Sequence, residues 1–248
     1  MRWYFVVLLL SEIVEGFAGF GSTAIALPFL AIAMDVGEGI AILGANAFVV
    51  SIVLTFTQLK KINWKEFVKI TLLVVPLLPL GILAFGALSR YQAVLKLVLG
   101  CVIMLVGTYY CYFGFVKKKE PRSLSKPVQI AALIGGAALQ GMFSTGGALI
   151  TLYASERMRD KGEFRATMSA MWLAVNAVAI PLRVVFLDVY TNQVWINAAK
   201  ALPFALGGLF IGMLLHKKID NGGFRKAIYV ILLAGGIAST IHTLTSIL

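Results

Sequence analysis

The sequence predicts an all-α polytopic membrane protein built from two related halves. Three observations predict this fold class: the 248 residues are 60% hydrophobic, only 13% of them are charged, and long apolar runs follow one another along the chain. Soluble domains average about 45–50% apolar and about 25% charged residues. The composition therefore excludes a soluble domain and a disordered chain, and it leaves a protein whose helices cross a lipid bilayer.

Six apolar runs have the length of a complete transmembrane helix, which is about 20 residues. These runs are Ala41–Leu59, Phe67–Leu88, Ala93–Val116, Ala166–Leu187, Ile196–Leu215 and Ala227–Ile247. We expect each of them to form one membrane span.

Two further apolar segments, Trp3–Met34 and Val128–Ser155, do not have the length of a simple span. Each is longer than one span and shorter than the roughly 40 residues that two spans and a turn require. Glycine and hydroxyl residues interrupt both segments near the middle, as EGFAGFGST at Glu15–Thr23 and as QGMFSTGG at Gln140–Gly147. We expect a break in the helix at both places.

The two broken segments are related to each other by an internal repeat. At an offset of 125 residues the aligned pairs are Gly16 with Gly141, Gly21 with Gly146, and Asp35–Glu38 with Asp160–Glu163. At an offset of 126 residues Gly81 aligns with Gly207, and Gly86 with Gly212. The chain is therefore interpreted as a single transporter domain made by duplication, with repeats at residues 1–115 and 128–248 and a basic linker at residues 117–127. Duplication is a common way to build a transporter with its substrate site between the halves.

The basic residues decide between two topologies. Seventeen of the 22 Lys and Arg residues lie in four connectors, which are Lys60–Lys69, Lys117–Lys126, Arg157–Arg165 and Lys217–Lys226. If the broken segments were ordinary spans, these residues would be divided almost equally between the two sides of the membrane. If each broken segment is a re-entrant hairpin, all seventeen face the cytoplasm, as the positive-inside rule prefers.

Each half then holds one glycine-broken re-entrant hairpin and three transmembrane helices. Because three crossings are an odd number, the second half is inverted relative to the first, and both termini lie outside. The same arrangement explains the net charge of +11 without a nucleic-acid partner, because the basic residues lie in short connectors between spans.

The chemistry is expected at the two breaks. The start of each half-helix offers unpaired N–H groups and the positive end of a helix dipole to an anion, and hydroxyl side chains stand at matching positions. The predicted substrate-binding residues here are Gly19, Gly21, Ser22, Thr23, Ser144, Thr145, Gly146 and Gly147. The alternative is that the glycines only let helices pack closely, as they often do in membranes.

Other polar residues within the apolar runs are further candidates. Arg183 is expected either to bind the anion through its guanidinium fork, or else to extend to the outer interface of the membrane or pair with Asp188. Asn46 and Asn176 lie in the middle of predicted spans, where they line the substrate path or form hydrogen bonds between helices. Glu15, ahead of Glu12, is the candidate for a coupling proton if burial favours its neutral form; the alternative is a carboxylate solvated at the interface.

The glycine-rich stretch Gly16–Pro28, GFAGFGSTAIALP, resembles the first segment of the TauE/SafE family of sulfite and organosulfonate exporters, also called the 4-toluene sulfonate uptake permease family. The degenerate second copy, the basic linker and the two-fold repeat extend the resemblance over nearly the whole chain. The chain departs from the family pattern at two places. It has Ser22-Thr23 where many relatives continue in glycine, and in the second copy it has Tyr153 in place of the proline. The resemblance implies transport of small sulfur-containing or carboxylated anions, driven by the proton gradient.

We therefore expect a secondary transporter that works by alternating access in the inner membrane of a bacterium, with a small anion and lipid as its partners. No cofactor or metal is expected, and the sequence does not decide between a monomer and a homodimer. An anion channel of the same architecture is the first alternative. An intramembrane enzyme is the second; it would need a nucleophile–base pair or a metal cluster at depth, which the residue pattern does not offer.

Overall fold

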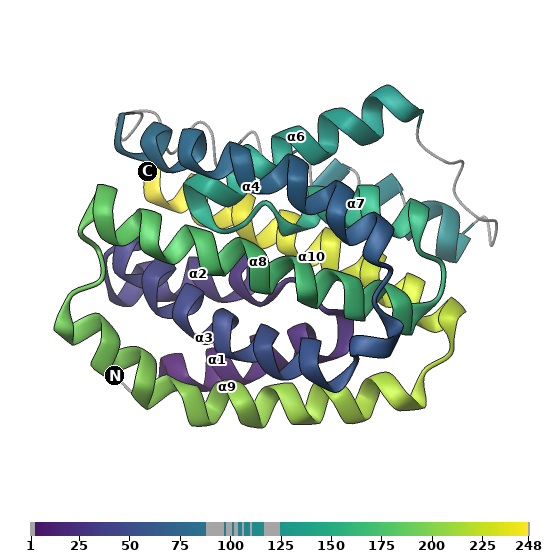
Figure 1. Ribbon diagram of the computed structural model, residues 1–248, viewed down its shortest axis with the longest axis horizontal. Coiled ribbons are helices and arrows are strands. Elements are labelled where there is room, and N and C mark those ends of the chain that lie inside the picture. The colour runs from purple at the N-terminus through teal and green to yellow at the C-terminus, as the bar shows by residue number, and fades with distance from the viewer. Residues whose placement is uncertain are drawn as a thin grey trace.

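The protein is an all-α bundle in the computed structural model, which describes residues 3–87, 97, 101, 104–105, 107–109, 111–116 and 125–247. Every described element is a helix (Figure 1). In chain order they are α1 (Trp3–Ala18), α2 (Ser22–Ala33), α3 (Val36–Thr57), η1 (Leu59–Lys61), α4 (Trp64–Ala87), η3 (Tyr112–Val116), α6 (Lys126–Phe143), α7 (Gly147–Arg157), α8 (Lys161–Leu187), α9 (Asn192–Lys218) and α10 (Asn221–Ile247).

Five of the described helices, α3, α4, α8, α9 and α10, are long and apolar enough to cross a membrane. They match five of the six predicted spans, and the prediction of an all-α membrane protein is confirmed. Nearly half of the remaining run, Ala93–Val116, and most of the linker at residues 117–127 lie outside the described residues. The described end of that run, Tyr112–Val116, is a short π-helix.

The outer surface of the bundle is apolar, as a lipid-facing surface requires. Large hydrophobic side chains point outward from several spans, among them Phe56 on α3, Leu72 on α4 and Val185 on α8, which are 65%, 69% and 74% exposed. Contiguous exposed apolar surface of this kind marks contact with a membrane or a partner. In a helix whose backbone hydrogen bonds are satisfied internally, such side chains are stable against lipid.

Short polar side chains fix where the helices begin. Asp35 accepts a hydrogen bond from the Gly37 amide at 2.7 Å, and Asp160 accepts from the amides of Gly162 and Glu163 at 2.9 and 2.8 Å. Such N-caps satisfy amides that have no acceptor within the first turn. The aligned runs at Asp35 and Asp160 are therefore two copies of one capping motif, and α3 and α8 begin before the apolar runs from which their spans were predicted.

Both broken segments are helical hairpins. The first bends at Gly19 and Gly21, whose φ angles are +81° and +106°, a backbone region that is open to glycine and strained for other residues. The second bends at Ser144, with φ +54°. In the second hairpin a Cβ added to Gly136 would lie 2.8 Å from Ile150, so α6 and α7 run side by side after the turn. The breaks stand where the sequence predicts them.

The two hairpins pack against matching partners, α1 against α9 and α6 against α4. A Cβ on Gly16 would overlap the carbonyl oxygen of Leu209, and a Cβ on Gly141 would lie 2.7 Å from the carbonyl oxygen of Leu78. Such close backbone approach is a known use of small residues between membrane helices. In Figure 1 α8 runs through the middle of the bundle, between these two groups of helices.

Gly81 and Gly207, which are aligned in the sequence, do not make matching contacts. Gly81 lies against Gly141, where a Cβ would be 2.8 Å from the Gly141 Cα, and Gly212 lies against Gly16, where a Cβ would be 2.8 Å from the Gly16 carbonyl carbon. Gly207 has nothing within 4 Å. Judged by the contacts that they make, Gly81 therefore corresponds to Gly212. The contact lies a few residues further from the start of the helix in α9 than in α4.

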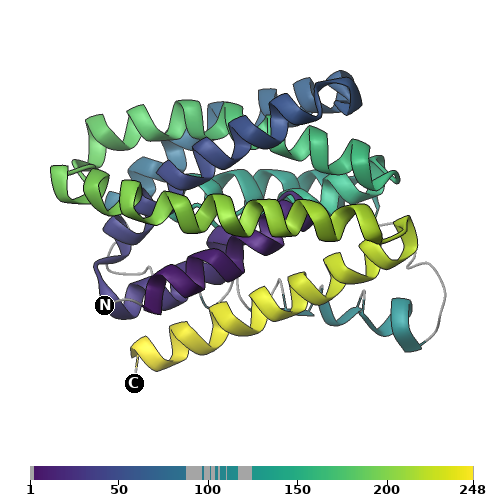
Figure 2. The ribbon, with the colours of Figure 1, turned by 90° about the horizontal axis from the view of Figure 1, so that it is seen from below.

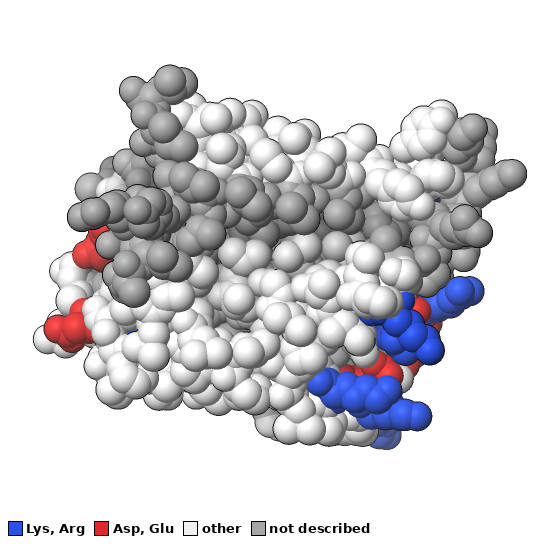
Figure 3. Space-filling view, turned by 90° about the horizontal axis from the view of Figure 1, so that it is seen from above, with Lys and Arg blue, Asp and Glu red and all other residues white. Residues whose placement is uncertain are grey.

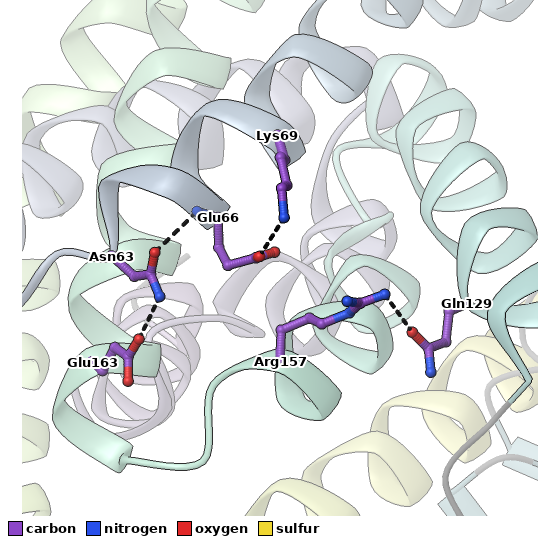
Figure 4. Close-up of polar contacts among 6 residues, drawn as sticks. All are labelled: Asn63, Glu66, Lys69, Gln129, Arg157 and Glu163. Carbon is purple, nitrogen blue, oxygen red and sulfur yellow. Dashed lines mark hydrogen bonds and ion pairs between the residues drawn. The ribbon is translucent and has the colours of Figure 1, made fainter.

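The basic connectors meet at one end of the bundle. The Asn63 side chain donates to the Glu163 carboxylate at 2.6 Å, and Arg157 donates to Gln129 at 3.3 Å (Figure 4). Lys161 donates through its ammonium to the carbonyl oxygens of His216 and Ile219, which ties in the connector between α9 and α10. Figure 3 shows Lys and Arg gathered at one end of the face drawn, with some Asp and Glu among them and others near the opposite end.

The opposite end of the bundle holds the connectors that follow α2 and α8. A Cβ on Gly37 would lie 3.1 Å from the Val189 side chain, and Asp35 and Asp188 are both exposed there. The two chain ends marked in Figures 1 and 2 lie at the same end of the long axis, away from the basic connectors. The basic connectors and the marked chain ends therefore lie at opposite ends of the long axis of the molecule.

Candidate functional site

One side chain of α8, Trp172, lies between the two hairpin breaks. Its indole nitrogen donates a hydrogen bond to the Gly19 carbonyl oxygen at 2.9 Å, and its ring would be 3.3 Å from a Cβ on Gly147. Trp172 itself is buried. The two predicted breaks therefore contact neighbouring atoms of one ring, which sequence reasoning missed. The available signal was a tryptophan in the middle of a predicted span, far from the interface where tryptophan usually lies.

Two arginines from α8 cap the first helix of each hairpin. Arg165 donates to the Gly16 carbonyl oxygen at 2.8 Å, and Arg183 donates through one nitrogen to the carbonyl oxygens of Gln140 and Gly141, both at 3.1 Å. A cation at a helix C-terminus is favoured by the helix dipole. Gly16 and Gly141 are the pair aligned in the sequence, so the contact recurs at matching places. Arg165 was missed because it belongs to a basic connector.

The two arginines differ in how completely they are paired. Arg165 also donates through two nitrogens to the Gln58 side-chain oxygen, at 3.2 and 2.9 Å. Arg183 has a buried nitrogen, Nη1, with no hydrogen-bond partner, and the Tyr190 hydroxyl is buried and unpartnered too. Both groups surround Gly44, where a Cβ would lie 3.1 Å from the Tyr190 hydroxyl and 3.9 Å from Arg183 Nη1.

The alternative expectation for Arg183 is wrong in both parts. The residue is 1% exposed, so it does not extend to the membrane interface, while Asp188 is exposed. Among the residues that the structure describes, no carboxylate forms an ion pair with Arg183. A buried, unpaired charge is costly, and an ionisable residue at membrane depth is by default a candidate for function.

The start of α2 is already occupied by a carboxylate of the chain itself. Glu15 accepts a hydrogen bond from the Ser22 amide at 3.0 Å. Ser22 and Glu15 are both buried, and Thr23 is half-buried. The expectation of an unpaired amide is therefore wrong for Ser22, and the alternative of a Glu15 solvated at the interface is wrong as well. Glu15 takes the place that an anionic substrate was expected to take.

The start of α7 has no such carboxylate. Gln140 stands at the position that aligns with Glu15, and Gly146, which precedes the helix, offers no capping side chain. The Ser144 hydroxyl is buried without a partner. The Ser144 amide donates to the Gln140 carbonyl oxygen at 3.0 Å, the same oxygen that accepts from Arg183. At the second break, the unpaired Ser144 hydroxyl, the start of α7 and the buried Arg183 guanidinium thus belong to one turn and its contacts.

The remaining predicted residues are less informative. The Asn46 amide nitrogen donates to the Ile42 carbonyl oxygen of its own helix at 3.0 Å, and its side-chain oxygen is buried and unpaired. Asn176 is buried on α8, and Thr145 and Gly147 are half-buried at the second break. In the described parts of the chain no group of three or more His, Cys, Asp or Glu residues is placed to hold a metal ion.

Comparison with known proteins agrees with this architecture. The sequence profile described as Sulfite exporter TauE/SafE matches residues 4–239. The chain belongs to the TauE/SafE sulfite exporter family. This confirms the resemblance drawn from the glycine-rich segment, and it makes the protein a membrane protein of a transporter family.

A curated relative of this TauE/SafE protein is the "Probable inner membrane transporter protein TsaS" of Comamonas testosteroni, which is 27% identical over 149 residues. The match covers 56% of this chain and 60% of the relative, so it spans less than two thirds of the relative's length. No solved structure matches the chain.

Proposed function

We propose that this protein is a secondary transporter that moves a small sulfur-containing or organic anion, such as sulfite or a sulfonate, across the inner membrane. Its membership of the TauE/SafE family and its similarity to a probable inner membrane transporter support the proposal. Five spanning helices around two broken hairpins are the kind of scaffold that secondary transporters use.

One observation carries the proposal: Arg183 is buried with an unpaired nitrogen, beside a helix start that has no carboxylate of its own. In our proposal the anion binds at this second break. It accepts hydrogen bonds from Arg183 Nη1, from the Ser144 hydroxyl and from the first amides of α7. A guanidinium matches the spacing of two oxygens on a sulfonate, sulfite or carboxylate group.

The first break has a different role in this proposal. Because the Glu15 carboxylate binds the Ser22 amide, the start of α2 repels an anion as long as Glu15 is charged. The two breaks are therefore unequal, with the second as the main anion site. Asn46, Asn176, Thr145 and Gly147 remain candidates for the substrate path rather than for the first contacts.

We further propose that the halves are inverted repeats that work by alternating access. The recurring contacts of Gly16 and Gly141 with a facing helix support a two-fold relation. The connector after α2 lies beside the connector after α8, and the connector after α7 lies among the basic connectors at the other end, which supports opposite directions of insertion. Rocking of one group of helices against the other would then expose the breaks to each side in turn.

The test is flux in proteoliposomes that contain the purified protein. We expect saturable uptake of at least one member of a panel of sulfite, thiosulfate, methanesulfonate, 4-toluenesulfonate and short carboxylates. Arg183→Gln should lower the apparent affinity at least tenfold, because a charge-assisted hydrogen bond is worth about 1.5–3 kcal/mol. Lys200→Gln, which removes an exposed cation, is the matched control. No uptake of any member would refute the proposal.

The same vesicles separate a transporter from a channel. A transporter should show counterflow, in which unlabelled anion inside accelerates the entry of labelled anion. A channel should show conductance without counterflow, and that result would replace the transporter with the alternative.

A further inference from the structure

We propose that Glu12 and Glu15 together form the proton-binding site of this protein, and that Glu12 is the member that carries the proton. The inference rests on the proposed transport function and names the residue that would couple it to protons. It changes the expectation from sequence, in which Glu15 is the first candidate.

Glu12 is the more completely buried of the two carboxyl groups. Its side chain is 0% exposed, and neither carboxyl oxygen has a hydrogen-bond partner. The close approach of α9 seals it: a Cβ on Gly208 would lie 2.9 Å from the Glu12 Cβ. Burying an ionised carboxylate without a partner costs far more than burying a neutral acid. A carboxyl group in this position is stable when it holds a proton.

Glu15 lies on the same face of α1, one turn further along. Residues three apart in a helix have their Cβ atoms about 5–6 Å apart, and the two carboxyl groups interact electrostatically. The Ser22 amide donates to Glu15 at the positive end of the α2 dipole, which favours a negative charge on Glu15 over one on Glu12. Two neighbouring buried carboxyl groups do not both ionise easily, so the charge stays on Glu15 and the proton on Glu12.

Among the elements packed against α1, α8 brings one buried cation, Arg165, whose hydrogen bonds go to the Gly16 carbonyl oxygen and the Gln58 side chain and not to a carboxylate. α2 has no titratable side chain. α9 brings Lys200, Lys217 and Lys218, which are exposed, and His216, whose ring nitrogen lies 2.8 Å from the Phe17 carbonyl oxygen. α10 reaches α1 where Phe224 packs on Phe17, and its Lys226 is exposed. Among the described residues neither Glu12 nor Glu15 forms an ion pair.

The carboxyl pair also links the binding of a proton to the binding of the anion. Binding converts one carboxylate and one proton from water into a carboxylic acid, and release to water on the other side reverses it. When Glu12 holds the proton, the pair carries one negative charge, on Glu15, instead of two. An anion near the breaks is then repelled less, so the proton and the anion favour each other and move in the same direction.

The first test needs no substrate. Infrared spectra of the protein in lipid vesicles, recorded across the neutral pH range, report the C=O band of protonated carboxylic acids, which carboxylates lack. We expect such a band in the wild type, its loss in Glu12→Gln, and its retention in Glu38→Gln, a control in the first turn of α3. Glu12→Asp should move the band rather than remove it. A band unchanged in Glu12→Gln, or absent from the wild type, would overturn the proposal.

The second test measures coupling with 4-toluenesulfonate, whose sulfonate group does not titrate near neutral pH. A proton gradient should accelerate uptake several-fold in the wild type and in Glu12→Asp, and not in Glu12→Gln. Uptake that responds to the gradient equally in all three would contradict the proposal. Failure of the wild type to take up any anion would count against the proposed function, and the infrared band would still decide the proton site.

Discussion

The indole nitrogen of Trp172 donates a hydrogen bond of 2.9 Å to the carbonyl oxygen of Gly19. Gly19 has a φ angle of +81°, and its carbonyl belongs to the turn that ends α1, so the bond joins α8 to the point at which the first hairpin reverses. The same ring lies against Gly147 at the start of α7. Trp172 is thus the residue through which the two breaks are mechanically connected.

Replacing Trp172 with phenylalanine should separate the hydrogen bond from the packing. Trp172→Phe keeps an aromatic ring against Gly147 but leaves the buried Gly19 carbonyl without its donor, at a cost of about 1–3 kcal/mol. We expect a lower melting temperature in detergent and slower transport. Trp64→Phe is the control, because Trp64 is 56% exposed. Equal melting temperatures for Trp172→Phe and the wild type would show that the bond does not hold the hairpin.

Gly146 should tolerate no side chain. In Gly146→Ala the new methyl group would overlap the Gly136 carbonyl oxygen and lie 2.6 Å from the Gln140 nitrogen, so α6 and α7 would have to separate. Overpacking against backbone costs about 1–3 kcal/mol or more, and the second break would lose its geometry. We expect loss of anion flux together with a lower melting temperature.

The matched control for Gly146 lies in the same hairpin. Gly135 has only the Leu149 side chain near it, at 3.7 Å, so Gly135→Ala should keep flux and stability close to those of the wild type. Wild-type flux in Gly146→Ala would mean that the second break does not require a tightly packed hairpin.

Ser144 allows stability and anion binding to change in opposite directions. Its φ of +54° costs a residue with a side chain about 1–2 kcal/mol, and its hydroxyl is buried without a partner. Ser144→Gly should relieve the strain and raise the melting temperature, while Ser144→Ala should keep the strain. Both variants should weaken anion binding about 3- to 10-fold, the effect of losing one hydrogen bond of about 0.5–1.5 kcal/mol. Unchanged affinity in both would exclude the hydroxyl from the site.

Local sequence patterns predict the breaks and the helix starts, but not the contacts that fill the site. Gly19, Gly21 and the capping residues Asp35 and Asp160 act on their own neighbours, so their pattern is visible in the sequence. Arg165 meets Gly16 across 149 residues and Trp172 meets Gly19 across 153 residues, and neither contact leaves a local pattern.

The unequal roles of the two breaks could be predicted only in part. That Glu15 aligns with Gln140 is evident from the sequence. That the Glu15 carboxylate turns onto the Ser22 amide depends on how tightly the chain reverses at Gly19 and Gly21, which spacing alone does not determine. The burial of Arg183 was equally hidden, because a position near the end of an apolar run is compatible with exposure.

The gathering of the basic connectors at one end of the bundle predicts which connectors share a side of the membrane. Single cysteines at Lys60 and Lys218 should be labelled by an impermeant reagent from one side, and cysteines at Asp35 and Asp188 from the other, since all four positions are exposed at their ends of the molecule. Cys101 and Cys111 must first be replaced by serine, because both are free thiols. By the positive-inside rule the lysine side is the cytoplasm. Labelling of Lys60 and Lys218 from opposite sides would place the basic connectors on different sides of the membrane. That result would refute the inverted arrangement of the two hairpins.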